Sequence, residues 1–175
     1  MPVTNRGFKK MKAEPHVDLI VAEAGKFRLA LEAGKERSVL FVSEDFPVMS
    51  CKLASILFAY HIIKKWPGIV VHGVSGSALN HDGDDTISHY WLECQGVAID
   101  LTADQYNILE DNQLNSEIIK SRPFSPVSIG GIGRMRNYKL FRVFGRDTYV
   151  SGLADLAEDF LRDLHDSYDA LSNLE

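Results

Sequence analysis

Two short runs of alternating residues, joined by a tight turn, constrain the fold more than any other part of the 175-residue chain. The first run is 89–93 (HYWLE), and the second is 97–101 (VAIDL). The segment 95–96 (QG) suits a two-residue turn, because glycine readily adopts the positive φ that such turns require. The pattern predicts an antiparallel β-hairpin in which Trp91 lies opposite Asp100.

The predicted hairpin has one apolar and one mostly polar face, because successive side chains of a strand point to opposite sides. The face expected to meet the core carries Tyr90, Leu92, Val97, Ile99 and Leu101. The other face carries His89, Trp91, Glu93, Ala98, Asp100 and Thr102. On this second face Asp100 is the diagonal neighbour of His89, roughly 7–8 Å away at the backbone. A carboxylate so placed can bind one imidazole nitrogen and leave the other to act as a base.

Apolar residues at steps of three and four predict a helix over 50–65. They are Leu53, Ile56, Leu57, Tyr60 and Ile63. Ser50 is the predicted N-cap, which puts Cys51 on the first turn. The positive end of a helix and a neighbouring imidazolium both favour a thiolate over a thiol. We therefore expect an activated Cys51 if this turn points at the polar face of the hairpin.

The remaining pattern predicts an α+β protein, with a Cys-bearing helix packed on an antiparallel sheet. Further helices are predicted over 16–33, ended by Gly34, over 116–120, and at the C-terminus on a stripe of Leu153, Leu156, Phe160, Leu164 and Leu171. Further strands are predicted over 69–74 and 138–144, and loops over 75–88 and 125–136. No repeat or low-complexity linker divides the sequence, so we expect a single domain over residues 1–175.

The order Cys, His, Asp, with the thiol opening a helix and the other two residues on paired strands, resembles the papain-like superfamily in its transglutaminase-like branch. The segments 89–93 (HYWLE) and 99–102 (IDLT) are similar to the His-x-Trp-x-Glu and Asp-x-Thr pattern of those enzymes. The resemblance spans residues 46–105. It implies a papain-like, transglutaminase-like fold with Cys51 as nucleophile, His89 as general base and Asp100 as the residue that orients the base.

One part of the papain-like pattern is different here. Papain-like proteases usually have a glutamine a few residues before the cysteine, where it helps to bind the oxyanion. This chain has Glu44 and Asp45 in that region. The donors of the oxyanion hole are therefore unassigned, and the backbone amide of Cys51 is the default candidate.

The resemblance implies thiol-dependent acyl transfer, most readily as a cysteine peptidase, amidase or deamidase acting on a protein, a peptide or a small amide. An amine in place of water would make the protein a transglutaminase or N-acyltransferase. We expect Trp91 and Ser50 to line the substrate cleft, and we expect no cofactor. An inactive binding module on the same fold is a second hypothesis.

A metal-dependent enzyme that uses His81, His89 and neighbouring aspartates is a third hypothesis and the weakest of the three. The loop 80–85 (NHDGDD) is rich in oxygen ligands, but it does not have the spacing of a calcium loop. A solvated loop is the preferred interpretation.

Charge and composition disfavour two classes of partner. The formal net charge of -5 argues against a nucleic-acid-binding surface. No run approaches the roughly 18 apolar residues of a membrane span, and no apolar signal region follows the basic N-terminus. Two cysteines, Cys51 and Cys94, make no disulfide framework. We expect a cytoplasmic protein, with export by a route that needs no signal left open, and we make no prediction of oligomeric state.

Overall fold

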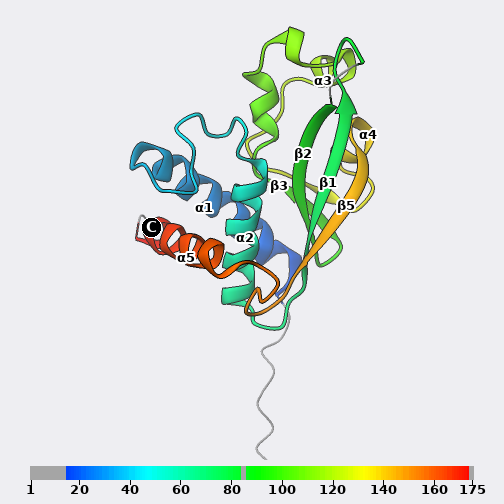
Figure 1. Cartoon of the computed structure of the whole chain (residues 1–175). Helices are drawn as coiled ribbons and strands as arrows, with labels where there is room; N and C mark the ends of the chain where they lie inside the picture. Colours follow the sequence, from blue (N-terminus) through cyan, green and yellow to red (C-terminus); the bar gives the residue numbers. More distant parts are fainter. Residues whose placement is uncertain (1–14, 84–85, 174–175) are drawn as a thin grey trace, which may run out of the picture.

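One antiparallel sheet forms the centre of the protein, in a computed structural model that describes residues 15–83 and 86–173 (Figure 1). Within these residues its strands are β1 (Val71–Leu79), β2 (Thr86–Cys94), β3 (Val97–Asp100), β4 (Ser128–Gly131) and β5 (Arg142–Tyr149). Their order across the sheet is β4-β3-β2-β1-β5, and all neighbours are antiparallel. The predicted α+β class is confirmed.

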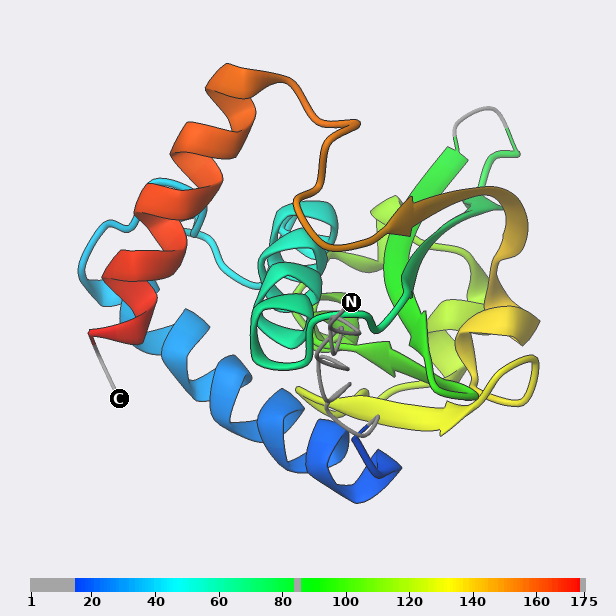
Figure 2. The same ribbon diagram turned by 90° about the horizontal axis from the view of Figure 1, so that it is seen from below.

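Three long helices lie on one side of this sheet. They are α1 (Val17–Glu36), α2 (Cys51–Lys65) and α5 (Glu158–Ser172). Figure 2 shows α2 next to the sheet, with α1 and α5 beyond it. Fully buried side chains such as Leu57 of α2 and Leu92 of β2 belong to one apolar cluster between these layers. Burial of this apolar surface fixes α2, and therefore its first residue Cys51, against the sheet.

The β2-β3 hairpin has the predicted register. Leu92 pairs with Ile99, and Glu93 pairs with Ala98. The turn residues Gln95 and Gly96 both have positive φ, 49° and 79°. Turn chemistry and alternation together were sufficient to define this element, since a shift of one residue would have moved every apolar side chain to the wrong face.

The second face of the hairpin is buried as well, and this corrects the expectation that it would be an open polar face. Trp91 and Ala98 are both 0 % exposed there, in a second apolar cluster. The cover comes from the chain that follows β3, through residues such as Tyr106, Phe124 and Phe141. This segment carries the short helices η1 (Ala103–Asn107), η2 (Asp111–Gln113), α3 (Ser116–Lys120) and α4 (Asn137–Leu140).

β1 extends well beyond the predicted strand, so the prediction of a loop over 75–88 was wrong for most of its length. β1 carries two glycines that face large rings of β2. A Cβ on Gly73 would lie 1.7 Å from Tyr90 Oη, and one on Gly76 would lie 2.8 Å from the Trp91 ring. Small residues are therefore needed where large rings of β2 cross β1, and their low strand propensity is overridden by packing.

Two other strand predictions need correction. The segment 125–136, predicted as a loop, contains the four-residue strand β4, which pairs with β3. The predicted strand over 138–144 is instead a helical turn, α4, followed by β5. In both places the local sequence is weakly patterned, and the pairing partner lies far away along the chain.

The helix predictions hold with shifted ends. α1 continues through Gly34, which is not its C-cap; a Cβ at Gly34 would lie 2.6 Å from Leu171 Cδ2, so the glycine allows α5 to pack closely. α5 begins at Glu158, so Leu153 and Leu156 of the predicted stripe precede the helix. In the described part of the chain, no helix has both the length and the apolar character needed to cross a membrane.

Candidate active site

His89 and Asp100 form a hydrogen-bonded pair inside the protein. The distance from His89 Nε2 to Asp100 Oδ2 is 2.6 Å, and both side chains are 0 % exposed. β2 and β3 carry the two residues, as the hairpin pattern predicted. Because Nε2 is occupied by the carboxylate, Nδ1 is the nitrogen left for proton transfer.

Further donors hold the Asp100 carboxylate in place. Its Oδ1 accepts from the backbone N–H of Thr102 at 2.9 Å, and its Oδ2 also accepts from Asn137 Nδ2 at 2.7 Å. Together with His89, these donors stabilise the charged form of the carboxylate. Sequence reasoning missed Asn137, since it reaches the site from α4 and no local signal marks it.

Aromatic rings surround the His89 imidazole on the second face of the hairpin. Ring centroids of Tyr106 and Phe141 each lie 5.2 Å from that of His89, and the Trp91 centroid lies at 6.0 Å. These rings exclude water and lower the local dielectric, so the interaction between His89 and Asp100 is little screened.

Cys51 begins α2 and is the partly exposed member of the set. Its thiol lies close enough to His89 to act on the imidazole through a side-chain hydrogen bond. The first turn of α2 also directs its backbone N–H groups and the positive end of the helix toward this point. The structure therefore brings together a partly exposed Cys51 and the fully buried pair of His89 and Asp100.

The charges of this cluster shift the titration of His89 and Asp100. Burial disfavours the imidazolium, but the charge and hydrogen bond of Asp100, together with Cys51, outweigh burial and raise the pKa of His89 to about 10. Burial also opposes the charged form of Asp100, but His89, Asn137 and the Thr102 N–H outweigh it and lower the pKa of Asp100. At neutral pH the pair is therefore an imidazolium and a carboxylate.

Gln105 contacts both the base and the loop before the nucleophile. Its Nε2 lies 3.3 Å from His89 Nδ1, and its Oε1 accepts from the backbone N–H of Met49 at 3.3 Å. The side chain is buried in η1, five residues after Asp100. Sequence reasoning did not single out Gln105, although a polar residue that closely follows a strand bearing Asp100 is a usable signal.

The two residues expected in the substrate cleft do not line open space. Trp91 is fully buried between β1 and the second apolar cluster. Ser50 is 3 % exposed, and its Oγ donates to Val48 O at 3.1 Å. Ser50 does occupy the N-cap position, but within the described residues it makes no side-chain capping bond. Trp91 lies on the hairpin face that the chain after β3 covers, and a role of either residue in a substrate cleft stays a prediction.

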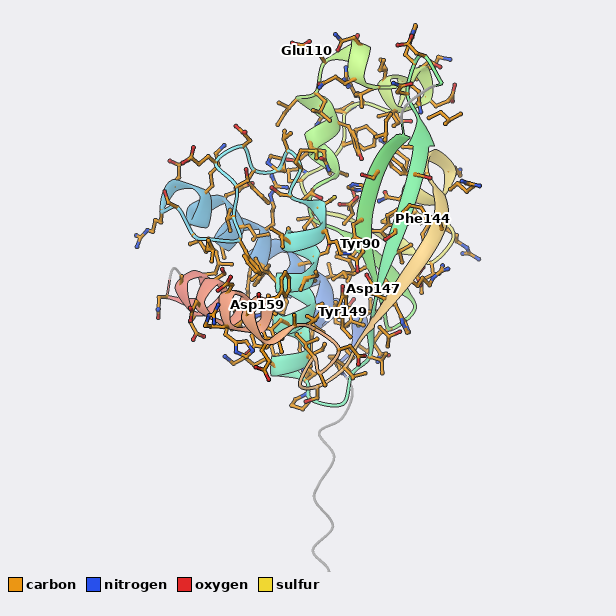
Figure 3. All side chains as sticks on the ribbon, viewed as in Figure 1. Tyr90, Glu110, Phe144, Asp147, Tyr149 and Asp159 are labelled. Atoms are coloured by element: carbon orange, nitrogen blue, oxygen red, sulfur yellow. The ribbon has the colours of Figure 1, made fainter. Side chains whose placement is uncertain are left out.

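A cavity of about 580 Å³ lies beside Lys52, the residue that follows Cys51, and its lining contains none of Cys51, His89 and Asp100. Its lining combines apolar side chains with charged ones, including Lys52, Ile56, Asp147, Tyr149 and Phe160. Tyr90 donates to Asp147 Oδ2 at 2.7 Å and contacts Tyr149 Oη at 2.7 Å, which fixes one wall (Figure 3). The cavity lies between α2 and the end of β5, and it is large enough for a substrate side chain.

The described residues hold no group of three His, Cys, Asp or Glu side chains that could bind a metal ion. His81 of the metal hypothesis is exposed and bonds to its neighbour Asp82, whereas His89 is buried in the sheet. Asp84 and Asp85 of that loop lie outside the described residues.

Comparisons with protein-family models, with curated proteins and with solved structures found no match.

Proposed function

We propose that this protein is a thiol-dependent acyl-transfer enzyme with a Cys51-His89-Asp100 triad, acting most readily as a cysteine hydrolase on a papain-like, transglutaminase-like fold. The observation that carries the proposal is the buried 2.6 Å bond between His89 Nε2 and Asp100 Oδ2, set behind a partly exposed thiol at the start of α2. A nucleophile, a base and an orienting carboxylate in contact are the parts that such chemistry requires.

The reaction follows from the positions of the protons. His89 Nδ1 takes the proton of Cys51 Sγ, and the sulfur attacks a carbonyl carbon while the C=O π electrons move to oxygen. When the tetrahedral intermediate collapses, the C–N or C–O bond breaks and the leaving group takes the proton from Nδ1. A thioester on Cys51 remains. Water, deprotonated by Nδ1, then attacks the thioester and releases the acid and the thiol.

Asp100 has an orienting role in this scheme. With Oδ2 on Nε2, the imidazole cannot turn, and Nδ1 stays directed at the sulfur. The raised pKa of His89 supports an imidazolium beside a thiolate before substrate binds. The aromatic rings around His89 keep water from competing for these bonds.

The proposed substrates are proteins, peptides or small amides. The cavity that starts at Lys52 supports this class, since its apolar residues suit a side chain and its charged residues suit a polar backbone or terminus. An amine that enters in place of water would give transfer instead of hydrolysis, as in a transglutaminase or N-acyltransferase. Cys51 is not part of a disulfide in the described chain, which supports a reducing, cytoplasmic setting.

The test uses p-nitrophenyl acetate, an activated ester that acylates thiolates. The Cys94→Ser variant is the parent, so that Cys51 is its remaining thiol, and Cys51→Ala in that parent is the control. We expect rapid release of nitrophenolate, an acetyl group on the peptide that contains Cys51, and loss of both in the control. Acylation no faster than that of a free thiol in solution would reject the enzyme and favour an inactive binding module.

The fate of the acetyl group separates hydrolysis from transfer. The acetylated protein is divided between buffer alone and buffer with glycine methyl ester. Loss of the acetyl group at the same rate in both would support hydrolysis. Faster loss with formation of the acetylated amine would support transfer.

A further inference from the structure

The side-chain amide of Gln105 has a fixed orientation at the point where the proposed chemistry occurs. Its Oε1 accepts the Met49 N–H at 3.3 Å, a backbone donor that cannot exchange roles. If the amide were turned over, its NH₂ group would face that N–H, donor against donor. The NH₂ group is therefore held toward His89 Nδ1, at 3.3 Å, in a side chain that is 3 % exposed.

A buried ion pair fixes the turn that carries Gln105. Arg28 of α1 binds both carboxylate oxygens of Asp104, the residue before Gln105, at 2.8 Å and 2.7 Å. The same guanidinium donates to Leu101 O at 2.6 Å, at the end of β3. Bidentate binding of this kind is rigid as well as strong. Gln105 is thus set in place from α1, independently of the residues that it contacts in the site.

The contact between Gln105 and Nδ1 holds only while Nδ1 has a lone pair to accept the amide N–H. In the imidazolium that His89 forms at neutral pH, Nδ1 carries a proton, so two donors face each other and the amide N–H has no acceptor there. A buried donor without an acceptor is destabilising. Because Oε1 stays bound to Met49, the N–H group is available to an acceptor near Nδ1, where the attack of Cys51 on a carbonyl creates negative charge.

We propose that Gln105 is a further catalytic residue, whose side-chain N–H binds the oxyanion that forms when Cys51 attacks a carbonyl. The inference rests on the proposed acyl-transfer function and assigns one donor of its oxyanion hole. The second donor is the backbone N–H of Cys51, one of the first-turn N–H groups of α2, which have no acceptor within the helix. A side-chain amide and a backbone amide are the usual pair of donors for such charge.

No atom changes its covalent partner at Gln105. As the sulfur bonds to the carbonyl carbon, the π electrons of C=O move to oxygen, and the Gln105 N–H donates to that oxygen. When the oxygen re-forms the double bond and the leaving group departs with the proton of Nδ1, that nitrogen regains its lone pair. The amide then returns to Nδ1, so the site is restored for the next step.

Two reactions of Cys51 separate this role from a structural one. Alkylation by iodoacetamide needs a thiolate but creates no oxyanion. Acylation by p-nitrophenyl acetate needs a thiolate and also creates an oxyanion. The variant is Gln105→Glu in the Cys94→Ser parent, because a carboxylate can still accept the Met49 N–H but has no N–H to donate. Gln105→Ala is the second variant. Gln113→Glu is the matched control, since Gln113 is exposed and its Oε1 also accepts a backbone N–H, that of Glu110.

We expect both Gln105 variants to lower the acylation rate by about 100-fold, while the alkylation rate changes by less than about 3-fold, and the control to leave both rates unchanged. Equal changes in acylation and alkylation would overturn the role of Gln105 and leave the triad intact. A parent protein that is alkylated rapidly but not acylated would overturn both proposals together. Thermal unfolding is measured for each variant, to identify a loss of rate that comes from misfolding. If one Gln105 variant is misfolded, the other variant decides the result.

Discussion

His89 Nε2 lies 2.6 Å from Asp100 Oδ2, although both side chains are completely withdrawn from solvent. Burial of two opposite charges is a weak source of stability, because their desolvation offsets much of their attraction. Apolar residues of similar size could fill the same space at less cost. The pair is therefore better explained by what it does for Nδ1 than by its contribution to folding.

Replacement of Asp100 tests how strongly its carboxylate raises the pKa of His89. In Asp100→Asn only Cys51 still opposes the effect of burial, so the pKa of His89 should fall well below about 10. The measurement is an NMR titration of the imidazole nitrogens. A pKa that stays near 10 in the variant would assign the shift to Cys51 instead.

The same variant should lose stability in a defined pH window. The raised pKa of His89 stabilises the fold fully below pH 6.5, the pKa of histidine in the unfolded chain, and this effect is lost as pH rises through about 10. The lowered pKa of Asp100 stabilises the fold above pH 3.8, the pKa of aspartate in the unfolded chain. The free energies of unfolding of wild type and Asp100→Asn, measured in urea, should therefore differ by about 1–3 kcal/mol near pH 6 and by less near pH 10. Asp111→Asn, whose ion pair with Arg122 is exposed, is the control and should change little.

A second buried charge, Glu23, lies far from the site and tests the electrostatics independently. Burial opposes its charged form, but hydrogen bonds and charges of Lys65 and His61, at 2.8 Å and 2.7 Å, lower the pKa of Glu23 to about 2. A lowered pKa stabilises the fold above the unfolded value near 4.5, and the effect is lost as pH falls toward 2.

Glu23→Gln should therefore be less stable than wild type by on the order of 2 kcal/mol near pH 6, with a smaller gap near pH 3. Urea unfolding at the two pH values measures the gap. A difference that does not depend on pH would mean that the variant acts through packing and not through charge.

Gly76 tests the close packing behind His89. A Cβ there would lie 2.8 Å from both the Phe141 Cβ and the Trp91 ring, and Gly76 is the β1 partner of His89. Gly76→Ala should lower the free energy of unfolding by about 1–3 kcal/mol, because the rings have no room to move.

The matched control is Gly25→Ala in α1, where a Cβ meets nothing within 4 Å. Alanine should raise stability there by about 0.5–1 kcal/mol, since it favours a helix over the unfolded chain. If the two substitutions changed stability in the same direction, the packing argument for Gly76 would fail.

Local pattern was enough to predict the parts of the site that lie on regular elements. The turn at Gln95-Gly96 set the register of the hairpin, and the register put His89 beside Asp100. The three- and four-residue spacing of apolar residues placed Cys51 on the first turn of α2. Each of these features depends on neighbours within a few residues, which is the range over which alternation and helical period are informative.

The covering of the second hairpin face could not be read from the same pattern. Tyr106, Phe124 and Phe141 come from irregular chain after β3 and pack on Trp91 across long sequence separations. Asn137 reaches Asp100 in the same way, and Gln105 reaches His89. Long-range packing of this kind decides whether a side chain is exposed or buried, so the burial of Trp91 could not be predicted from the hairpin pattern.

The relation of this fold to papain-like proteins stays a prediction, and so does the single domain over residues 1–175. The first depends on a resemblance in the order and spacing of Cys51, His89 and Asp100, and the second on the lack of a repeat or linker in the sequence. The proposed activity depends on the same three residues but can be tested without knowledge of the fold family.

The most direct test of the proposed activated thiol is the rate of iodoacetamide labelling of Cys51 against pH. The parent is the Cys94→Ser protein, and the comparison is the same protein with His89→Ala. Rapid labelling that persists below about pH 7 in the parent and slows at least tenfold without His89 is the expected result, because an imidazolium holds the sulfur as a thiolate. Labelling that in both proteins rises only near pH 8.5, as for an ordinary thiol, would contradict the triad.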